Sequence, residues 1–388
     1  MVFNSVIVRF SGEIAIKSRG VRTYWENLLV DRIRRVCEGE LIREGLRVYI
    51  KTEKPMETIS RLKYIFGLSS FSPAIMVDPI YEEIEDAAFR IVDYTLQEDD
   101  SITTFGIFVE KNLRDDIDSN ELKVKLGDEI RKKYNLKVKL KGTHLPICIE
   151  IREKKAFLFT ERIPGPGGLP LGTQDKLVSM FSGGPDSSLA SWYAMRRGSK
   201  IVLVYLDFGG EPLRSEALER ALKGAERLSL WGGVEKLYII DFDQVIRDMR
   251  EKAPDKVIYL LFKRYMMRVA KIVAKYEGAS GIVTGEIIGE QASQTVRNLA
   301  IITEAAGNDL PVFRPLISFD KDEVLRKLKD IDNELYLIAA KSIEPCKTLT
   351  VKPKMNLTLN AIQTYEKRIG IGESTLKKLV KNAEIIYY

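Results

Sequence analysis

Six residues near the middle of the chain combine glycine, serine and a carboxylate in a pattern suited to phosphate chemistry. They read Ser182-Gly183-Gly184-Pro185-Asp186-Ser187, between an apolar run at 177–181 and a helix-like segment. Two glycines at a strand-to-helix turn leave backbone N–H groups exposed, and these donors and the helix dipole bind phosphate. The carboxylate of Asp186 suits Mg²⁺ that bridges phosphate oxygens. No Gly-Lys-Ser/Thr follows, so this is not a Walker A loop.

Two later segments carry further groups that suit a nucleotide site. The segment 284–295 reads TGEIIGEQASQT, in which Gly285 permits close backbone approach to a ligand and Gln294 offers a donor and an acceptor. The segment 314–321 reads RPLISFDK, and Lys321 opens a predicted helix. A lysine there can reach phosphates and stabilise negative charge that develops on them. Taken singly, these features also fit an ordinary loop and a surface lysine.

The segment 121–142 is strongly basic. It holds eight basic and three acidic residues, a net charge of +5, whereas the whole chain has a formal net charge of +6. Such a segment fits either a solvated helix face or a surface for a polyanion such as RNA.

The composition is that of a globular protein with ample material for a core. Its 388 residues suffice for two or three domains, with 45% hydrophobic and 30% charged residues. No apolar run approaches the ~20 residues that a membrane helix needs, and the N-terminus lacks a signal-peptide layout. We therefore expect a cytoplasmic protein. The three cysteines, Cys37, Cys148 and Cys346, form no CxxC, and their odd number argues against a disulfide framework.

Alternating strands and helices place the chemical groups at one edge of a sheet. From residue 176 onward the pattern predicts strands at 177–181, 201–207, 236–242, 281–284 and 312–318, and helices at 187–197, 214–230, 255–277 and 321–330. This alternation predicts a doubly wound parallel sheet with helices on both faces. Ligands bind such sheets at the carboxyl ends of the strands, where the three segments emerge.

The N-terminal half shows shorter elements. The pattern predicts a βαβ-like unit over 1–56 and a small α/β domain over 57–162. Seven of the eleven residues from 163 to 173 are Gly or Pro, which predicts a linker, 163–175, without a packed element. The large domain then spans 176–360, and 361–388 reads as a C-terminal helical extension with a tail.

Three motifs in this order, SGGPDS, TGEIIGEQASQT and RPLISFDK, resemble the tRNA 4-thiouridine synthetase family, the ThiI-type sulfurtransferases. The stretches IFGLSSFSPA and EIREKKAFLFTERIPGPGGLPLGT resemble the THUMP domain and linker of that family, and KSRGVRTYWENLL its ferredoxin-like subdomain. The resemblance covers about 5–355. It implies an N-terminal α+β half, ferredoxin-like then THUMP, and a C-terminal α/β pyrophosphatase domain of the PP-loop, adenine nucleotide α hydrolase-like fold.

The resemblance also implies a reaction and the residues that serve it. ATP, with Mg²⁺, adenylates O4 of uridine 8 of tRNA; a sulfur donor then attacks C4, and AMP leaves. Asp186 and Lys321 would serve adenylation. The implied ATP-binding residues are Met180, Phe181, Ser182, Gly183, Gly184, Asp186, Ser187, Tyr205, Leu206, Lys263, Gly285 and Gln294. Basic residues of the N-terminal half would bind tRNA: Lys17, Arg19, Arg22, Lys123, Lys132 and Lys133.

The sulfur step is the part that the sequence describes least completely. Cys346 falls where the family carries a reactive cysteine, and the neighbouring Lys341 and Lys347 favour its thiolate. The chain shows neither a rhodanese domain nor a CxxC near Lys263, so we expect free sulfide or a separate persulfide carrier as the sulfur donor, and no metal ligands. Relatives suggest a homodimer.

Two alternatives stay open. The chain could be another tRNA-adenylating enzyme of the PP-loop type, making a 2-thiolated base or lysidine. It could also be a non-catalytic tRNA-binding protein, although the intact Asp186 and Lys321 argue against that. A role in supplying sulfur for thiamine is a further possibility by analogy with the family.

Overall fold

A computed structural model describes residues 2–111, 118–291, 294–341 and 357–388. The chain forms two compact units, Met1–Gly168 and Leu169–Tyr388. Among the described residues, no helix has the length and apolar character needed to cross a membrane.

Unit 1 is built on one continuous mixed sheet whose order is β2-β3-β1-β4-β8-β7-β5-β6, with β9 also paired to β4. Its strands are β1 Ser5–Phe10, β2 Glu40–Glu44, β3 Arg47–Lys51, β4 Leu68–Val77, β5 Thr104–Lys111, β6 Lys137–Val138, β7 Leu145–Ile151, β8 Ala156–Phe159 and β9 Ile163–Pro164. Its helices are α1 Gly12–Ala15, α2 Arg19–Val36, α3 Pro55–Leu62, α4 Tyr81–Glu98 and α5 Ser119–Tyr134.

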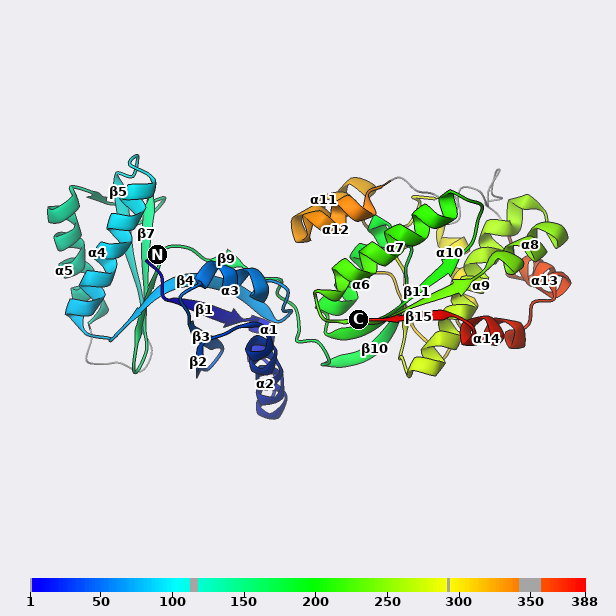
Figure 1. Cartoon of the computed structure of the whole chain (residues 1–388), viewed down its shortest axis with the longest axis horizontal. Coiled ribbons are helices and arrows are strands. Elements are labelled where there is room, and N and C mark those ends of the chain that lie inside the picture. Colours follow the sequence, from blue (N-terminus) through cyan, green and yellow to red (C-terminus); the bar gives the residue numbers. More distant parts are fainter. Residues whose placement is uncertain (1, 112–117, 292–293, 342–356) are drawn as a thin grey trace. The chain divides into compact units, whose positions relative to one another are not determined.

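The ten-residue strand β4 belongs to both halves of this sheet. Its residues up to Ala74 pair with β1, and Ile75 to Val77 pair with β8. Helix α3 packs on β1 and β4, whereas α4 and α5 cover the half-sheet of β7 and β5 (Figure 1). The apolar core between these helices and strands includes Ile91, Leu126 and Ile147. Strand β4 therefore joins the two half-sheets. The domain boundary expected between residues 56 and 57 stays a prediction.

The Gly- and Pro-rich segment 163–175 is better ordered than its composition indicates. Its first part pairs as β9 with β4, and Gly167 N donates to Leu68 O. Its second part is hydrogen-bonded to the turn that precedes β11, because Gly172 N donates to the carbonyl oxygen of Gly198 in that turn. Backbone hydrogen bonds to flanking elements therefore replace the packed side chains that glycine and proline lack.

Unit 2 contains a six-stranded sheet of order β14-β13-β10-β11-β12-β15. The first five of these strands are parallel, as the alternating pattern predicts, and β15 is antiparallel to β12. Its strands are β10 Gln174–Met180, β11 Ser199–Asp207, β12 Val234–Asp241, β13 Ile282–Val283, β14 Val312–Phe313 and β15 Glu384–Tyr387. Its helices are α6 Pro185–Arg196, α7 Leu213–Ser229, α8 Asp243–Lys252, α9 Asp255–Glu277, α10 Val296–Glu304, α11 Lys321–Ile331, α12 Asn333–Ala339, α13 Leu359–Ile369 and α14 Glu373–Lys381.

Helices cover both faces of this sheet, which confirms the doubly wound α/β fold. Helices α6 and α7 pack on one face, with α11 and α12 against them. The long helix α9 packs on the other face, with α8, α10, α13 and α14 around it. The strand order reverses at β10, because β11 and β12 lie on one side of it and β13 and β14 on the other. Such switch points are where open α/β sheets bind ligands.

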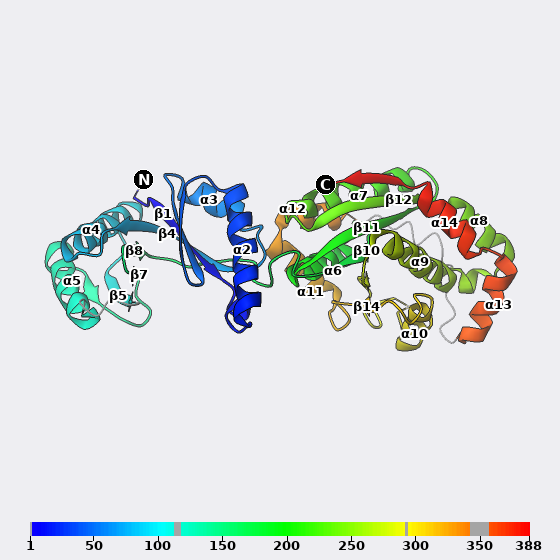
Figure 2. The ribbon, with the colours of Figure 1, turned by 90° about the horizontal axis from the view of Figure 1, so that it is seen from below.

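Two elements differ from their expected form. The strand expected at 312–318 stops at Phe313, because Pro315 cannot donate to the ladder and a turn follows in which Ile317 N donates to Arg314 O. The C-terminal segment is two helices and a strand rather than one helix with a tail. Gly370 ends α13 in the left-handed conformation, and β15 pairs antiparallel with β12 at the sheet edge (Figure 2).

Candidate active site

The SGGPDS segment forms the tight turn between β10 and α6. Gly183 has φ +70°, and a Cβ there would lie 2.7 Å from Ala221 Cα, so the turn packs directly on the backbone of α7. Gly184 is the N-cap of α6, with no side-chain hydrogen bond to the cap. Ser187 Oγ donates to Gly184 O (3.1 Å) and accepts from Ser182 N (3.2 Å). The turn is therefore held from within, and the helix N-terminus can accept a phosphate.

Gly285 brings the loop after β13 against the first turn of α6. A Cβ at this position would lie 2.6 Å from Asp186 C and 2.9 Å from Ser187 N. The close approach expected from this glycine is thus an approach to the α6 backbone. It joins the two sides of the switch point into one rigid wall.

Lys321 connects this wall to α11. Its Nζ lies 2.7 Å from both carboxylate oxygens of Asp186 and 3.3 Å from Glu290 Oε1. The pair is partly open to solvent, with side-chain exposures of 41% for Lys321 and 24% for Asp186. The structure therefore brings together two residues 135 positions apart that the sequence predicts to act on the same phosphates.

The carboxylates of Asp186 and Glu290 fit a magnesium ion at the phosphates. Mg²⁺ in nucleotide sites takes one or two carboxylates, with phosphate oxygens and water completing its shell. Among the described residues, no group of three or more His, Cys, Asp or Glu side chains could hold a metal by itself.

A cavity of about 200 Å³ lies at the carboxyl ends of β10 and β11. Apolar side chains of Val204, Phe208, Phe262 and Met266 form part of its wall. Ten of the predicted ATP-binding residues line it: Met180, Phe181, Ser182, Asp186, Ser187, Tyr205, Leu206, Lys263, Gly285 and Gln294. Gly183 and Gly184 instead form the turn beside the cavity, and Lys321 contacts Asp186 at its rim.

Buried polar groups also face this cavity. Glu286 is 2% exposed; Arg314 Nε donates to it at 2.8 Å, and Lys263 Nζ lies 3.9 Å away. Gln294 is buried, and its Oε1 has no hydrogen-bond partner within the described part of the chain. Because a buried acceptor without a donor is costly, Gln294 is suited to accept a hydrogen bond from a ligand.

Sequence reasoning missed Arg220 and Glu286. Arg220 is a buried residue of α7 that lines the cavity, and it donates to Ser182 O (3.2 Å) and to Lys341 O (3.0 Å). The available signal was an arginine on the apolar face of a helix, beside Ala217 and Ala221. The hydrogen bond from its guanidinium to Ser182 O thus fixes the SGGPDS turn against α7.

The predicted RNA-binding residues lie on two parts of unit 1. Lys17 and Arg19 are exposed around α1 and the start of α2, and Arg22 pairs with Glu26 at 2.7 Å. The others lie on α5: Lys123 is half-buried, Lys132 pairs with Glu129 at 2.8 Å, and Lys133 lies 4.1 Å above the Phe89 ring.

Two of the three cysteines, Cys37 and Cys148, lie among the residues that the structure describes. Burial raises the pKa of Cys37 to about 11, and burial also raises the pKa of Cys148. Both thiols therefore stay protonated near neutral pH and are poor nucleophiles. Cys346, the predicted reactive cysteine, lies outside the described residues.

Known proteins resemble this chain along its whole length. Residues 172–371 match the family model described as "Thiamine biosynthesis protein (ThiI)", 5–72 match the ThiI ferredoxin-like domain, and 81–161 match the THUMP domain.

The chain belongs to the ThiI family.

Relatives within the ThiI family carry consistent names. A probable tRNA sulfurtransferase of Methanothermobacter thermautotrophicus is 33% identical over 98% of both chains. One of Aeropyrum pernix is 34% identical over 89% of this chain and 87% of its own. A crystal structure of a 4-thiouridine synthetase–RNA complex with bound ATP is 28% identical, covers 99% of both chains and superposes with a TM-score of 0.87. The ThiI fold, with its ferredoxin-like, THUMP and PP-loop parts, thus extends over both units.

Proposed function

We propose that this chain is an ATP-dependent tRNA sulfurtransferase that makes 4-thiouridine at position 8 of tRNA. The observation that carries the proposal is the meeting of the SGGPDS turn, Asp186 and Lys321 at the rim of a cavity, in a chain whose fold matches a 4-thiouridine synthetase over its full length. The proposal includes a cytoplasmic location and a homodimer, as expected from the sequence and from relatives.

Adenylation is the first step that the site supports. The turn and the α6 N-terminus bind the ATP phosphates, and the cavity receives the nucleoside, with Gln294 accepting a hydrogen bond. Uridine O4 attacks the α-phosphorus, and the bond to pyrophosphate breaks. Lys321 stabilises the charge that develops on the leaving pyrophosphate. Bound Mg²⁺ would neutralise phosphate charge, held by Asp186 and Glu290.

Lys321 has to exchange partners during this step. In the structure the Lys321 ammonium lies between Asp186 and Glu290, and its positive charge reduces the repulsion between the two carboxylates. When phosphates arrive, the ammonium turns toward them, and Asp186 becomes available to a cation. Partial exposure of both side chains permits this exchange without leaving a buried charge unpaired.

Sulfur transfer is the second step. Sulfur attacks C4 of the adenylated base, and AMP leaves with O4. We assign the sulfur nucleophile to a persulfide on Cys346, formed when a separate persulfide carrier passes its outer sulfur to the Cys346 thiolate and keeps a thiol. Attack of this sulfur on C4 leaves a disulfide between Cys346 and the base, which a second thiol, supplied as a reductant, reduces to release 4-thiouridine. Free sulfide, if it is the donor, attacks C4 directly and needs no persulfide on Cys346. Cys37 and Cys148 do not suit this role, because their raised pKa values keep them as thiols.

RNA binding falls to unit 1. The lysines of α5 and of the α1–α2 region supply a sequence-independent attraction to phosphates. A base in a stack hides its edge from an enzyme, so the modified uridine has to be presented unstacked. The solved 4-thiouridine synthetase with bound RNA and ATP supports the proposal that one chain of this fold holds both ligands.

The test combines unmodified tRNA and Mg-ATP with the full-length chain and, in parallel reactions, either sulfide or a low-molecular-weight persulfide with a thiol reductant. We expect 4-thiouridine and AMP from wild type, and a loss of both from Asp186→Asn. The matched control is Asp309→Asn, because Asp309 is also paired with a lysine, Lys271, at 2.7 Å but lies away from the cavity. With the persulfide donor, Cys346→Ser should release pyrophosphate yet form little 4-thiouridine, whereas Cys148→Ser should behave like wild type. With sulfide, which attacks C4 directly, Cys346→Ser should still form 4-thiouridine.

Three outcomes would overturn the proposal in different ways. Modification that depends on lysine instead of sulfur would identify a lysidine-type enzyme. Sulfur at C2 of the base would identify a 2-thiolating enzyme. Binding of tRNA without any release of pyrophosphate would identify a non-catalytic RNA-binding protein.

A further inference from the structure

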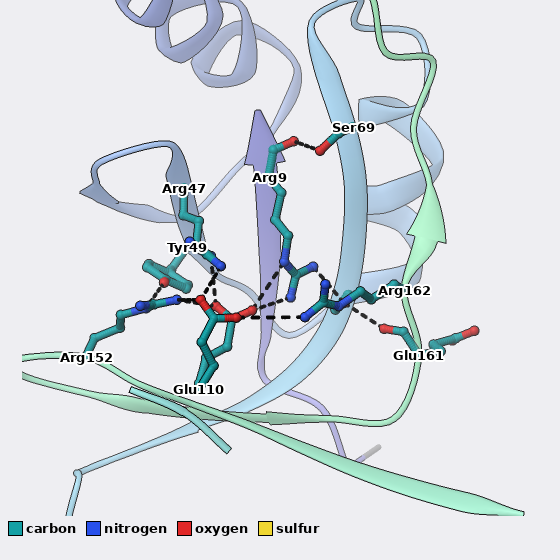
Figure 3. Close-up of polar contacts among 10 residues, drawn as sticks. Arg9, Arg47, Tyr49, Ser69, Glu110, Arg152, Glu161 and Arg162 are labelled. Carbon is teal, nitrogen blue, oxygen red and sulfur yellow. Dashed lines mark hydrogen bonds and ion pairs between the residues drawn. The ribbon is translucent and has the colours of Figure 1, made fainter. Parts of the chain in front are cut away.

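Unit 1 contains a buried charged cluster that plays no part in the ATP site. We call it the Glu150 hub, and it consists of Glu150, Arg9, Arg47, Arg152 and Glu110. Figure 3 labels the last four, whose side chains point toward one another. The Glu150 carboxylate is 1% exposed and receives three guanidinium groups. Arg9 approaches Oε1 at 2.6 Å, while Arg47 and Arg152 approach Oε2 at 3.0 and 2.8 Å.

The hub connects two parts of the chain that belong to different family domains. Arg9 on β1 and Arg47 on β3 lie within the ferredoxin-like match, 5–72, and Glu150 on β7 lies within the THUMP match, 81–161. Glu110 of β5 adds a second carboxylate, which Arg47 approaches at 2.5 Å and Arg152 at 3.2 Å. The sequence separation of Arg9 and Glu150 is 141 residues.

The backbone connection between the same two parts is narrow. Strand β4 pairs with β1 up to Ala74 and with β8 from Ile75 onward, so one strand carries the sheet from one part to the other. Single strands twist and bend readily, because sheet twist varies by tens of degrees between neighbouring strands. Side-chain contacts across the joint therefore have to set its angle.

Those contacts combine an apolar cluster that includes Ile7, Tyr49, Phe157 and Phe159 with a set of polar interactions. Tyr49 of β3 stacks on Phe157 of β8, with ring centroids 3.9 Å apart and planes 11° apart. Its hydroxyl accepts a hydrogen bond from Arg152 Nε at 2.6 Å. The Arg9 guanidinium lies 4.9 Å above the Phe159 ring and donates to Ser72 Oγ at 3.0 Å. Glu150 is the group on which the two arginines of the ferredoxin-like part meet a THUMP strand.

We propose that Glu150 is a positioning residue for tRNA, which holds the ferredoxin-like and THUMP parts at one angle so that their basic side chains contact one RNA together. The inference rests on the proposed tRNA-modifying function. The basic residues concerned are Lys17 and Arg19 in the first part and Lys132 and Lys133 in the second. A joint already set for binding spares the RNA the cost of ordering it.

The consequence is a specific loss of affinity. A joint that samples several angles holds the competent one for only a fraction of the time, and apparent affinity falls by that fraction. Glu150→Gln leaves three guanidinium groups around a neutral amide, and their mutual repulsion opens the joint. We expect the Kd for tRNA to rise about tenfold, which corresponds to a competent fraction near one tenth.

The experiment compares full-length variants by filter binding to unmodified tRNA and by steady-state kinetics. Arg47→Gln is the milder variant, because Glu150 then keeps Arg9 and Arg152; we expect a roughly threefold rise in Kd. The matched control is Glu57→Gln on α3, an exposed carboxylate paired with Arg61 at 2.6 Å. It should bind tRNA like wild type.

Two further readouts separate positioning from general damage. The KM for ATP and the kcat at saturating tRNA should stay at wild-type values in both hub variants. The slope of log Kd against log salt should also stay unchanged, because a buried carboxylate makes no phosphate contact that could be lost. A thermal melt shows that each variant is folded at the assay temperature; if Glu150→Gln is not, Arg47→Gln decides.

Wild-type Kd values in both hub variants overturn the inference, as does a fall in kcat with unchanged Kd. The outcome is separable from that of the proposed function. A wild-type chain that binds tRNA without thiolating it contradicts the function while the Kd comparison still stands. Wild-type thiolation together with unchanged Kd values contradicts the inference alone.

Discussion

The central ion pairs of the two units differ in burial and in the number of partners that each carboxylate has. In unit 1 the Glu150 carboxylate is 1% exposed and bound by three guanidinium groups. In unit 2 Asp186 and Lys321 pair at the rim of the cavity with side-chain exposures of 24% and 41%. Buried, multiply bonded charges are costly to separate, whereas partly hydrated ones exchange partners at little cost. The first arrangement suits a fixed joint and the second suits a site that has to rearrange.

Lys321→Met should give the largest effect, and it should fall on chemistry alone. We expect 4-thiouridine formation to drop by about 10³-fold, the scale for losing one group that stabilises charge in a transition state. The unfolding free energy should change by less than about 0.5 kcal/mol, because the pair is partly exposed. Single-turnover thiolation and urea unfolding measure the two quantities. A large loss of stability would erase the contrast between the units.

Glu150→Gln should show the reverse pattern. Removing one partner of a buried charge cluster destabilises by about 3–5 kcal/mol. Hydrogen exchange followed by mass spectrometry should show faster exchange in β1, β3 and β7, with β10 and β11 unchanged. Equal acceleration in both units would mean that the hub is not a local device of unit 1.

Gly285→Ala tests whether the wall of the cavity is as rigid as its packing indicates. A Cβ would meet the Asp186 backbone at 2.6 Å, so the loop or α6 must shift. Such overpacking costs about 1–3 kcal/mol, and we expect the KM for ATP to rise roughly tenfold. Gly372→Ala is the control, because a Cβ there meets nothing within 4 Å. An unchanged KM would show that the active-site wall yields more easily than the hub.

Acid should weaken the hub by a smaller, graded amount. Burial by itself raises the pKa of Glu150, but Arg9 and Arg47 outweigh it, and the pKa of Glu150 lies below its ordinary value in the folded chain. Its stabilising contribution is therefore complete above the pKa of an unfolded glutamate, about 4.3, and is lost as pH falls through the lower folded value. Exchange rates of β7 measured between pH 6 and pH 3 check this. Glu150→Gln should remove that part of the pH dependence.

Local patterns predicted much of unit 2. Helix α9 spans 255–277 as its periodicity predicts, and the switch point brings together Asp186, Gly285 and Lys321 as the strand order implies. The expectations that differ from the structure lie where local signals mislead. The Gly- and Pro-rich residues 163–175 are held by backbone pairing, and β15 completes the sheet from a segment that carried no motif.

The side-chain partners were beyond the reach of local patterns. Arg220 supports the phosphate turn from a helix 38 residues away, and the sequence marks it merely as an arginine on an apolar face. Glu286 lies inside the segment TGEIIGEQASQT, yet its burial beside Arg314 follows from the packing of two loops. Such contacts depend on how strands are ordered, which the spacing of residues does not encode.

The sequence by itself determined the family, the alternation of strands and helices, and the turn that binds phosphate, because these depend on residues that lie close together in the chain. The tertiary structure decided which charges meet. Lys321 reaches Asp186 across 135 residues, and Arg9 reaches Glu150 across 141. The physical reason is that the strength of an ion pair depends on its distance and burial, and both are set when the sheets assemble.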